Sequence, residues 1–143
     1  MAYNFQVVFD CHDPHGLAEW WAETLGWHVE PQDAAFILSM IEQGHATEAD
    51  THRHKGALVW REGAAITSEP EGSEHTTRIY FQQVPEAKNS KNRVHLDLRL
   101  GADDPAQLRE ALVARGATIL STGAQGSHTW AVMADPEGNE FCV

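Results

Sequence analysis

The sequence has only two cysteines and few basic residues. Cys11 and Cys142 form no CxxC or Cys/His spacing, so a disulfide framework is not indicated and free thiols suit a reducing compartment. Ten Lys and Arg residues stand against 21 Asp and Glu residues, which gives a formal charge of -11. This charge repels a phosphate backbone and argues against nucleic acid as a partner.

Long apolar runs are also missing. No stretch approaches the ~18 apolar residues that a membrane span needs, and the first ten residues, MAYNFQVVFD, lack the basic start and apolar middle of a signal peptide. We therefore expect a cytoplasmic protein without a membrane partner. With 143 residues, of which 42% are hydrophobic, the chain has the length and composition of one globular domain.

The first half of the chain begins with a strand and a helix. Residues 3–10 alternate between two faces, which predicts a strand. The following segment predicts a helix with Asp13 as N-cap, Pro14 in the first turn and Gly26 at its end. A short strand, WHVEP, comes next.

The second half repeats this plan. A strand over Arg93–Leu100 precedes a helix capped by Asp104 and closed by Gly116. The two caps are 91 positions apart in the sequence, and Gly26 and Gly116 are 90 apart. We interpret the chain as a duplicated strand–helix–strands unit.

Further segments fill the two halves. Additional strands are predicted over GALVWREGAAITS, TRIYFQQV, ATILS, HTWAVMADP and NEFCV. The segment DAAFILSMIEQG has helical spacing, and HATEADTHRHKG, which follows it, is predicted to be a polar, irregular loop. The loop contains His45, His52 and His54, which could bind zinc, but without a nearby cysteine or a helical i, i+4 pair a solvated loop is favoured.

Three motifs resemble a known superfamily. The helix end WWAETLGW, the strand NRVHLDLRL and the turn DPEGNEFCV resemble those of the glyoxalase/bleomycin-resistance/dioxygenase superfamily, also called vicinal oxygen chelate proteins. The chain is most similar to the glyoxalase-like domain proteins of that superfamily. The superfamily hosts isomerases, dioxygenases, thiol transferases and drug-binding proteins, so the motifs are specific for fold and weak for chemistry.

The resemblance implies an α+β fold of two βαβββ modules that form a cupped mixed β-sheet with the helices outside. It implies a single domain over residues 1–143, with module one at about 1–86 and module two at about 92–143. On the strand NRVHLDLRL, we expect Val94, Leu96 and Leu98 to face the helices and His95 and Asp97 to face the cup.

The resemblance also places four potential metal-ligand positions. These positions are Gln6, Gln82, His95 and Cys142. The set contains no carboxylate to hold a dication and move a proton, which disfavours a lactoylglutathione lyase. Gln6 stands where an extradiol dioxygenase needs a histidine, which disfavours that activity too.

Glu140 shares a strand face with Cys142, which allows an alternative metal set of Gln6, His95 and Glu140. We expect no cofactor in the leading interpretation and a divalent metal in the alternative. Cys142 beside His95 is either an activated thiol or a small apolar side chain, and the second is favoured.

Other residues are candidates for ligand contacts. Trp60 and Trp130 lie on predicted strands and either line the pocket or pack in the core. Asp97 either orients the His95 imidazole or pairs with a neighbouring arginine.

The leading hypothesis is a metal-independent, glyoxalase-like pocket protein that binds or transforms a small organic metabolite or drug. His95, Glu140 and Cys142 are its catalytic candidates, and the expected ligand contacts are Gln6, Gln82, Asp97, Trp60 and Trp130. The alternative is a metal-dependent lyase or isomerase that uses His95, Glu140 and Gln6. The sequence leaves open whether the protein is an enzyme. We expect a homodimer, because two-fold pairs are the commonest closed oligomers.

Overall fold

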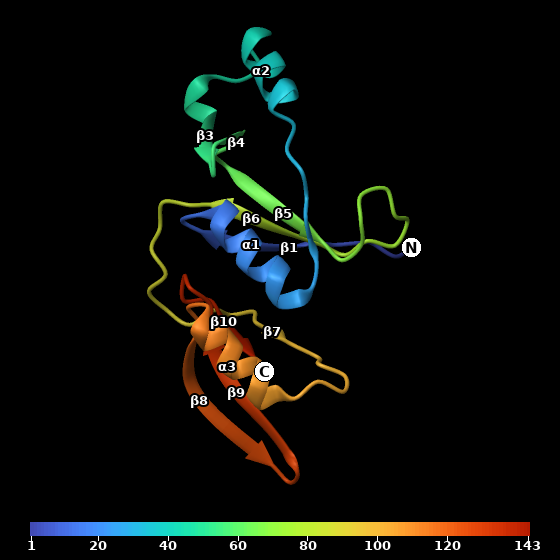
Figure 1. Cartoon of the computed structure of the whole chain (residues 1–143), viewed down its shortest axis with the longest axis vertical. Coiled ribbons are helices and arrows are strands. Elements are labelled where there is room, and N and C mark those ends of the chain that lie inside the picture. The colour runs from blue at the N-terminus through green and yellow to red at the C-terminus, as the bar shows by residue number, and fades with distance from the viewer. The chain divides into compact units, whose positions relative to one another are not determined.

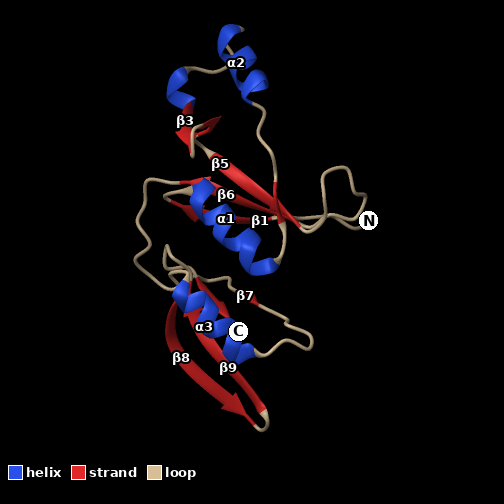
Figure 2. Cartoon of the chain, in the orientation of Figure 1, coloured by secondary structure: helices blue, strands red, loops and turns tan.

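The computed structural model describes residues 1–143, and the chain divides into two compact units, unit 1 (1–87) and unit 2 (88–143). Each unit contains a four-stranded sheet and a crossover helix (Figure 1, Figure 2). The strand order is β1-β6-β5-β2 in unit 1 and β7-β10-β9-β8 in unit 2. In both units the first and last strands of the module therefore lie side by side. The predicted strand–helix–strands repeat is confirmed, while a single domain over the whole chain stays a prediction.

The sheet of unit 1 is mixed. Its strands are β1 (Val7–Cys11), β2 (His28–Val29), β5 (Gly63–Thr67) and β6 (Arg78–Gln83). β1 runs parallel to β6, while β5 is antiparallel to both β6 and β2. A parallel pair needs a crossover, and helix α1 (Pro14–Leu25) provides it.

Helix α1 covers one face of this sheet. The Asp13 side chain accepts a hydrogen bond from the Gly16 N–H (3.0 Å), and Gly26 ends the helix with a left-handed φ of 67°. The Phe9 ring meets Trp21 at 5.4 Å and Phe81 at 5.2 Å between ring centroids. Burial of such side chains contributes about 1.5–3 kcal/mol each. Both predicted helix ends are confirmed.

An insertion between β2 and β5 distinguishes unit 1. It contains α2 (Ala34–Glu42), a 3₁₀ turn η1 (Glu48–Asp50) and a hairpin of β3 (Thr51–His54) and β4 (Ala57–Trp60). The helical spacing of DAAFILSMIEQG is confirmed by α2. The prediction of an irregular loop is wrong, because four of its residues, Thr51–His54, form β3. This strand pairs with β4 through a turn at Lys55 and Gly56 (φ 50° and 84°).

Unit 2 contains the second sheet and helix α3 (Pro105–Ala114). Its strands are β7 (Leu96–Asp97), β8 (Thr118–Gln125), β9 (His128–Ala134) and β10 (Glu140–Cys142). The Asp104 carboxylate accepts from the Ala106 N–H at 2.9 Å, which confirms the predicted cap. Leu112, Met133 and Phe141 are fully buried and form the centre of this core.

The turn between β9 and β10 fixes the last strand. The buried carboxylate of Asp135 accepts hydrogen bonds from the backbone N–H groups of Glu137 (2.9 Å) and Asn139 (3.0 Å). Gly138 takes a φ of 92°, which favours glycine. This turn determines where Glu140 and Cys142 emerge on β10.

Both predicted first strands are longer than the observed ones. β1 starts at Val7, and Tyr3 and Phe5 are 84% and 91% exposed. β6 begins at Arg78, the residue before the partner of Val7, so residues 3–5 have no strand to pair with.

In unit 2 the predicted strand Arg93–Leu100 is reduced to the two residues of β7. Its only neighbour is β10, which has three residues, so the ladder cannot extend. Val94 is 75% exposed, and the prediction that it packs in the core is wrong.

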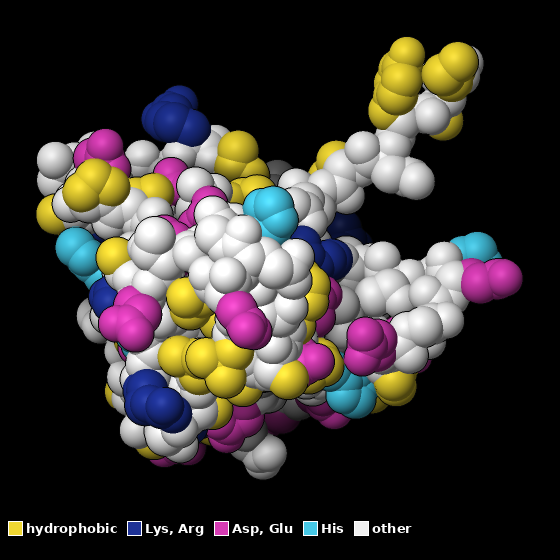
Figure 3. Space-filling model, turned by 90° about the horizontal axis from the view of Figure 1, so that it is seen from above, with side chains coloured by type: hydrophobic (Ala, Val, Ile, Leu, Met, Phe, Trp, Pro, Cys, Tyr) yellow, Lys and Arg dark blue, Asp and Glu magenta, His cyan; other side chains and the backbone are white.

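No helix of the chain has the length and apolar character that crossing a bilayer requires. On the face shown in Figure 3, Lys and Arg side chains stand in separate spots, and Asp and Glu side chains are spread between them.

Candidate functional site

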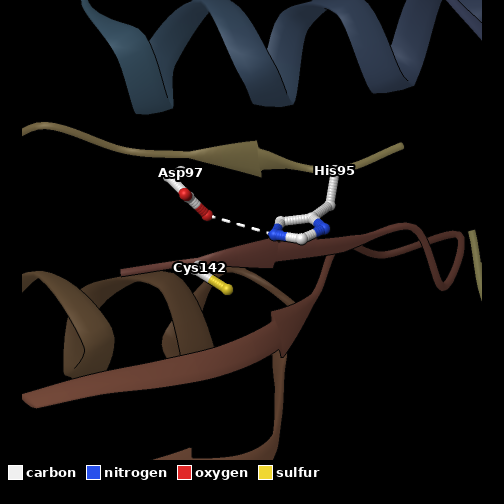
Figure 4. Close-up of side chains that lie close together, drawn as sticks. All are labelled: His95, Asp97 and Cys142. Atoms are coloured by element: carbon white, nitrogen blue, oxygen red, sulfur yellow. Dashed lines mark ion pairs between the residues drawn. The ribbon is translucent and has the colours of Figure 1, made fainter. Parts of the chain in front are cut away.

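The open face of the unit 2 sheet carries three polar side chains. Leu96 pairs with the buried Phe141, and Asp97 pairs with Cys142. Because side chains alternate along a strand, His95, Asp97 and Cys142 lie on the face opposite the core. Figure 4 shows the three together, with the imidazole turned toward the carboxylate.

The three side chains are close enough to interact. His95 Nε2 lies 3.2 Å from Asp97 Oδ1, and the donor atoms of His95, Asp97 and Cys142 all lie within 4.8 Å of one another. The side chains of His95 and Asp97 are 43% and 69% exposed. The group is therefore accessible to a ligand from solvent.

The electrostatics do not activate the thiol. Burial raises the pKa of the Cys142 thiol, and the negative charge and hydrogen bond of Asp97 raise that pKa further. The thiol is thus protonated at neutral pH. In this geometry Cys142 offers a weak hydrogen-bond donor rather than a thiolate nucleophile.

These residues line a pocket of about 440 Å³. Other lining residues are Leu98, Arg99, His128, Thr129, Trp130 and Val143. The indole of Trp130 lies across Gly123 on the neighbouring strand, where an added Cβ would come within 2.4 Å of the ring. Gly123 thus provides space for the aromatic wall. Sequence reasoning missed this role, because it depends on the cross-strand register.

The Glu140 side chain forms its contacts outside the pocket. It accepts hydrogen bonds from the Asn92 backbone N–H (3.0 Å) and the Lys88 ammonium (3.1 Å), and its side chain is only 11% exposed. Burial alone would raise the pKa of Glu140, but these hydrogen bonds outweigh burial and lower that pKa. The carboxylate therefore anchors the segment before β7. The donor group of unit 2 consists of His95, Asp97 and Cys142, and Glu140 is not part of it.

Gln6 and Gln82 belong to unit 1. The side-chain oxygen of Gln6 accepts a hydrogen bond from Arg78 (2.9 Å), and Arg78 also binds both oxygens of Glu30 at 2.8 Å. The hydrogen bond from Arg78 lowers the pKa of Glu30, and the same pair raises the pKa of Arg78. Gln82, on β6, is half-buried and lies next to Asp10 and Gly63 in the sheet.

Unit 1 has a larger cleft, of about 990 Å³, which Trp60 helps to line. Further lining residues include Phe36, Met40, Glu62, Arg78 and Tyr80. The Gln32 side chain fixes this wall: it accepts from the Trp60 N–H and donates to the Gly63 carbonyl, both at 2.8 Å. Gln32 gave no signal in the sequence, since its partners lie some 30 positions away.

Residues 6–143 match the family described as the glyoxalase-like domain. The chain belongs to this family. A comparison with curated proteins gives no match. The predicted superfamily is therefore confirmed by the match to almost the full length of the chain.

Solved structures confirm the fold of this glyoxalase-like domain. The fosfomycin resistance protein FosX from Listeria monocytogenes has a TM-score of 0.59 at 6% identity, covering 99% of this chain and 91% of its own. A glyoxalase/bleomycin resistance protein/dioxygenase superfamily member from Sphaerobacter thermophilus has a TM-score of 0.54 at 15% identity, with 99% and 95% covered. A protein from Agrobacterium tumefaciens has a TM-score of 0.60 at 13% identity, with 100% and 96% covered. The predicted α+β class is confirmed.

The donor group of the glyoxalase-like domain is chemically suited to a dication. It combines an imidazole, a carboxylate and a thiol, all of which are ligand types that zinc accepts, and three protein ligands are the usual number in sites with an open position. A bound ion would require the Cys142 thiolate, which the present arrangement disfavours.

Proposed function

We propose that this glyoxalase-like domain protein binds a small organic molecule in the pocket of unit 2, and does so without a tightly held metal. The observation that carries the proposal is the joint presence of His95, Asp97 and Trp130 in one pocket of about 440 Å³. Ligand sites typically measure about 300–1,000 Å³ and combine aromatic walls with a few polar groups.

The polar groups indicate which ligand chemistry fits. A carboxylate only accepts hydrogen bonds, so in the neutral ring the nitrogen that faces Asp97, His95 Nε2, is the one that carries the proton. His95 Nδ1 then keeps its lone pair and accepts a proton or hydrogen bond from the ligand. A flat molecule with a hydroxyl or N–H group would stack on Trp130 and donate to His95. If the protein is an enzyme, His95 is the general base, and the reaction is a lyase or isomerase step that begins with proton abstraction.

A metal-dependent lyase or isomerase is the second candidate. It is favoured by the donor atoms of His95, Asp97 and Cys142, which lie within 4.8 Å of one another. In this candidate the three side chains hold the ion, and they replace the set of Gln6, His95 and Glu140. A bound dication would supply a Lewis acid for a ligand oxygen.

The test uses protein purified without an affinity tag, stripped with a chelator and screened against small aromatic molecules by thermal shift. His95→Ala should weaken a bound hit at least tenfold, about 1.4 kcal/mol, because it removes the central acceptor. The melting temperature without ligand should stay unchanged, since the His95 side chain is 43% exposed and lies on the face opposite the core. Val94→Ala is the matched control on the same segment. Unchanged affinity in His95→Ala would refute the site, and binding that depends on added metal would favour the second candidate.

We also propose that the protein acts as a cytoplasmic homodimer. The exposed Tyr3 and Phe5 support an interface, because exposed aromatic side chains close together are typical of contact surfaces. Light scattering at micromolar concentration should give twice the chain mass. A Tyr3→Ser/Phe5→Ser double variant should shift the mass toward the monomer, and a wild-type monomer would rule the dimer out.

A further inference from the structure

Helix α2 exposes apolar side chains to the cleft of unit 1. Of its nine residues only Ile37 is buried. Phe36 lines the cleft and is 54% exposed, and Met40, one turn further on the same side of the helix, lines it too. Figure 1 shows α2 beside the hairpin of β3 and β4, on which it packs, and away from the sheet. An exposed apolar surface inside a concave pocket is typical of a ligand site.

Two further aromatic side chains form the wall of this cleft. Trp60 is fixed at the end of β4 by the hydrogen bond from its backbone N–H to Gln32. The phenol of Tyr80 lies across Gly63, where an added Cβ would collide with it. The Arg78 guanidinium lies 5.5 Å from the centroid of the Tyr80 ring. The arginine therefore already covers Tyr80, and the rings of Trp60 and Phe36 remain for a ligand.

Carboxylates outnumber cationic side chains around the cleft. Its charged lining residues are Glu30, Asp33, Asp50, Glu62, Arg61 and Arg78, so the carboxylates exceed the guanidinium groups by two. Both guanidinium groups are engaged within the protein. Arg78 binds Glu30, and Arg61 donates to two backbone carbonyl oxygens at 3.0 and 2.8 Å. Neither arginine is therefore free to neutralise the remaining carboxylates.

One of these carboxylates, Glu62, is available to a ligand. Asp33 caps α2, and Asp50 accepts a hydrogen bond from a backbone N–H of the turn before η1. Glu62 has neither role and is exposed. Burial raises the pKa of Tyr80, and the negative charge of Glu62 raises that pKa further. The phenol is thus neutral at pH 7, and the charge of Glu62 reaches into the cleft.

We propose that the cleft of unit 1 binds an organic cation with a flat, apolar body, such as an arylalkylammonium ion. The body packs against Phe36, Met40 and Trp60, and the ammonium group faces Glu62 and the Trp60 ring, since aromatic faces attract cations. An anion would meet the excess carboxylates, and a neutral molecule would gain nothing from Glu62. This occupant is distinct from the ligand proposed for unit 2, which needs the groups around His95.

Three indoles that differ only in their side group test the charge preference. Tryptamine carries an ammonium group, tryptophol a hydroxyl group and indole-3-acetate a carboxylate. In calorimetric titrations of the wild-type protein at low salt, tryptamine should bind at least threefold more tightly than tryptophol, and indole-3-acetate should bind most weakly. At an ionic strength of about 1 M most of this difference should disappear, because salt screens exposed charges.

Variants locate the site. Glu62→Gln should remove the preference for tryptamine and leave the affinity for tryptophol unchanged, while Glu86→Gln, at an exposed carboxylate outside the cleft, should change neither. Phe36→Ala should weaken both molecules, because it removes part of the apolar wall. His95→Ala should leave tryptamine binding intact, which separates this site from the pocket of unit 2. Thermal melts should show that all four variants are folded.

Several results would overturn the proposal. The cation site is refuted if tryptamine does not bind or if the wild type binds the three indoles equally well. It is also refuted if Glu62→Gln keeps the full preference for tryptamine. Loss of tryptamine binding in His95→Ala alone would place the cation in unit 2 and leave the cleft of unit 1 without this role.

Discussion

The two units share one topology but differ in whether the polar side chains of their pockets have internal partners. In the cleft of unit 1 several polar groups already have partners: Arg78 binds Glu30 and Gln6, and Asp33 caps helix α2. In unit 2 Glu140 is bound by Asn92 and Lys88, while His95 and Asp97, which line its pocket, remain accessible to solvent. The proposed ligand pocket of unit 2 thus keeps accessible polar groups, whereas the cleft of unit 1 uses several of its polar groups for internal contacts.

The insertion explains part of this contrast. Residues 34–60 of unit 1 add a helix and a hairpin, and they supply much of the wall of the 990 Å³ cleft. Unit 2 has no such insertion, so its 440 Å³ pocket is bounded by its own sheet. The smaller pocket has the denser set of reactive groups, and this is why we assign the ligand to it.

The largest expected effect tests whether each unit depends on its own core. Phe81→Ala in unit 1 and Phe141→Ala in unit 2 both remove a fully buried ring. Each should lower the free energy of unfolding by about 3–5 kcal/mol, measured by urea denaturation. Phe36→Ala, at an exposed ring of α2, is the control and should stay within about 0.5 kcal/mol of the wild type. A small loss of stability in Phe141→Ala, with a large loss in Phe81→Ala, would mean that unit 2 lacks a tightly packed core.

Alanine substitutions at two glycines should separate effects on stability from effects on ligand binding. At Gly63 a Cβ would lie 2.7 Å from the Phe81 carbonyl oxygen and closer still to the Tyr80 ring, so Gly63→Ala should cost about 1–3 kcal/mol by overpacking. At Gly123 the three atoms nearest to the Cβ all belong to the Trp130 side chain. Gly123→Ala should therefore displace the indole, cost less stability and weaken a ligand of unit 2. Equal losses of stability, with ligand affinity retained, would contradict the role given to Trp130.

Acid should destabilise the protein through its paired carboxylates. The folded-state pKa of Glu140 lies below its ordinary value of 4.5, so its contribution is complete above 4.5 and is lost as the pH falls through the lowered value. Glu140→Gln should reduce the stability at pH 7 and make the melting temperature less dependent on pH below 4.5. Glu86→Gln, at an exposed carboxylate, should change neither. An unaltered acid profile in Glu140→Gln would show that the contacts with Asn92 and Lys88 contribute little.

The sequence predicted the parts of the fold that local chemistry determines. The caps at Asp13 and Asp104 and the turn at Asp135 depend on neighbours within five positions, and the structure contains all three. The pairing of Glu140 with Asn92 and the packing of His15 on His52 join residues more than 35 positions apart. The periodicity of a sequence does not reveal such long-range contacts. The sequence analysis therefore predicted Glu140 as a site residue and His52 as part of a solvated loop.

The smallest expected effect compares the two hairpin turns. The turn of unit 1 has Lys55 at φ 50°, and the turn of unit 2 has Gly126 at φ 62°. A left-handed conformation costs a residue with a Cβ about 1–2 kcal/mol, so Gly126→Ala should destabilise unit 2 by about 1 kcal/mol.

Lys55→Asn should act in the opposite direction, because asparagine tolerates this conformation and favours the first position of such turns. The substitution also removes the exposed ion pair with Glu19, which is worth only about 0–1 kcal/mol. The gain from the more favourable turn conformation and the loss of the ion pair nearly cancel. Urea denaturation should therefore find a change in the free energy of unfolding within about 0.5 kcal/mol. A loss as large as that of Gly126→Ala would mean that the Glu19 contact, and not the turn conformation, holds the hairpin.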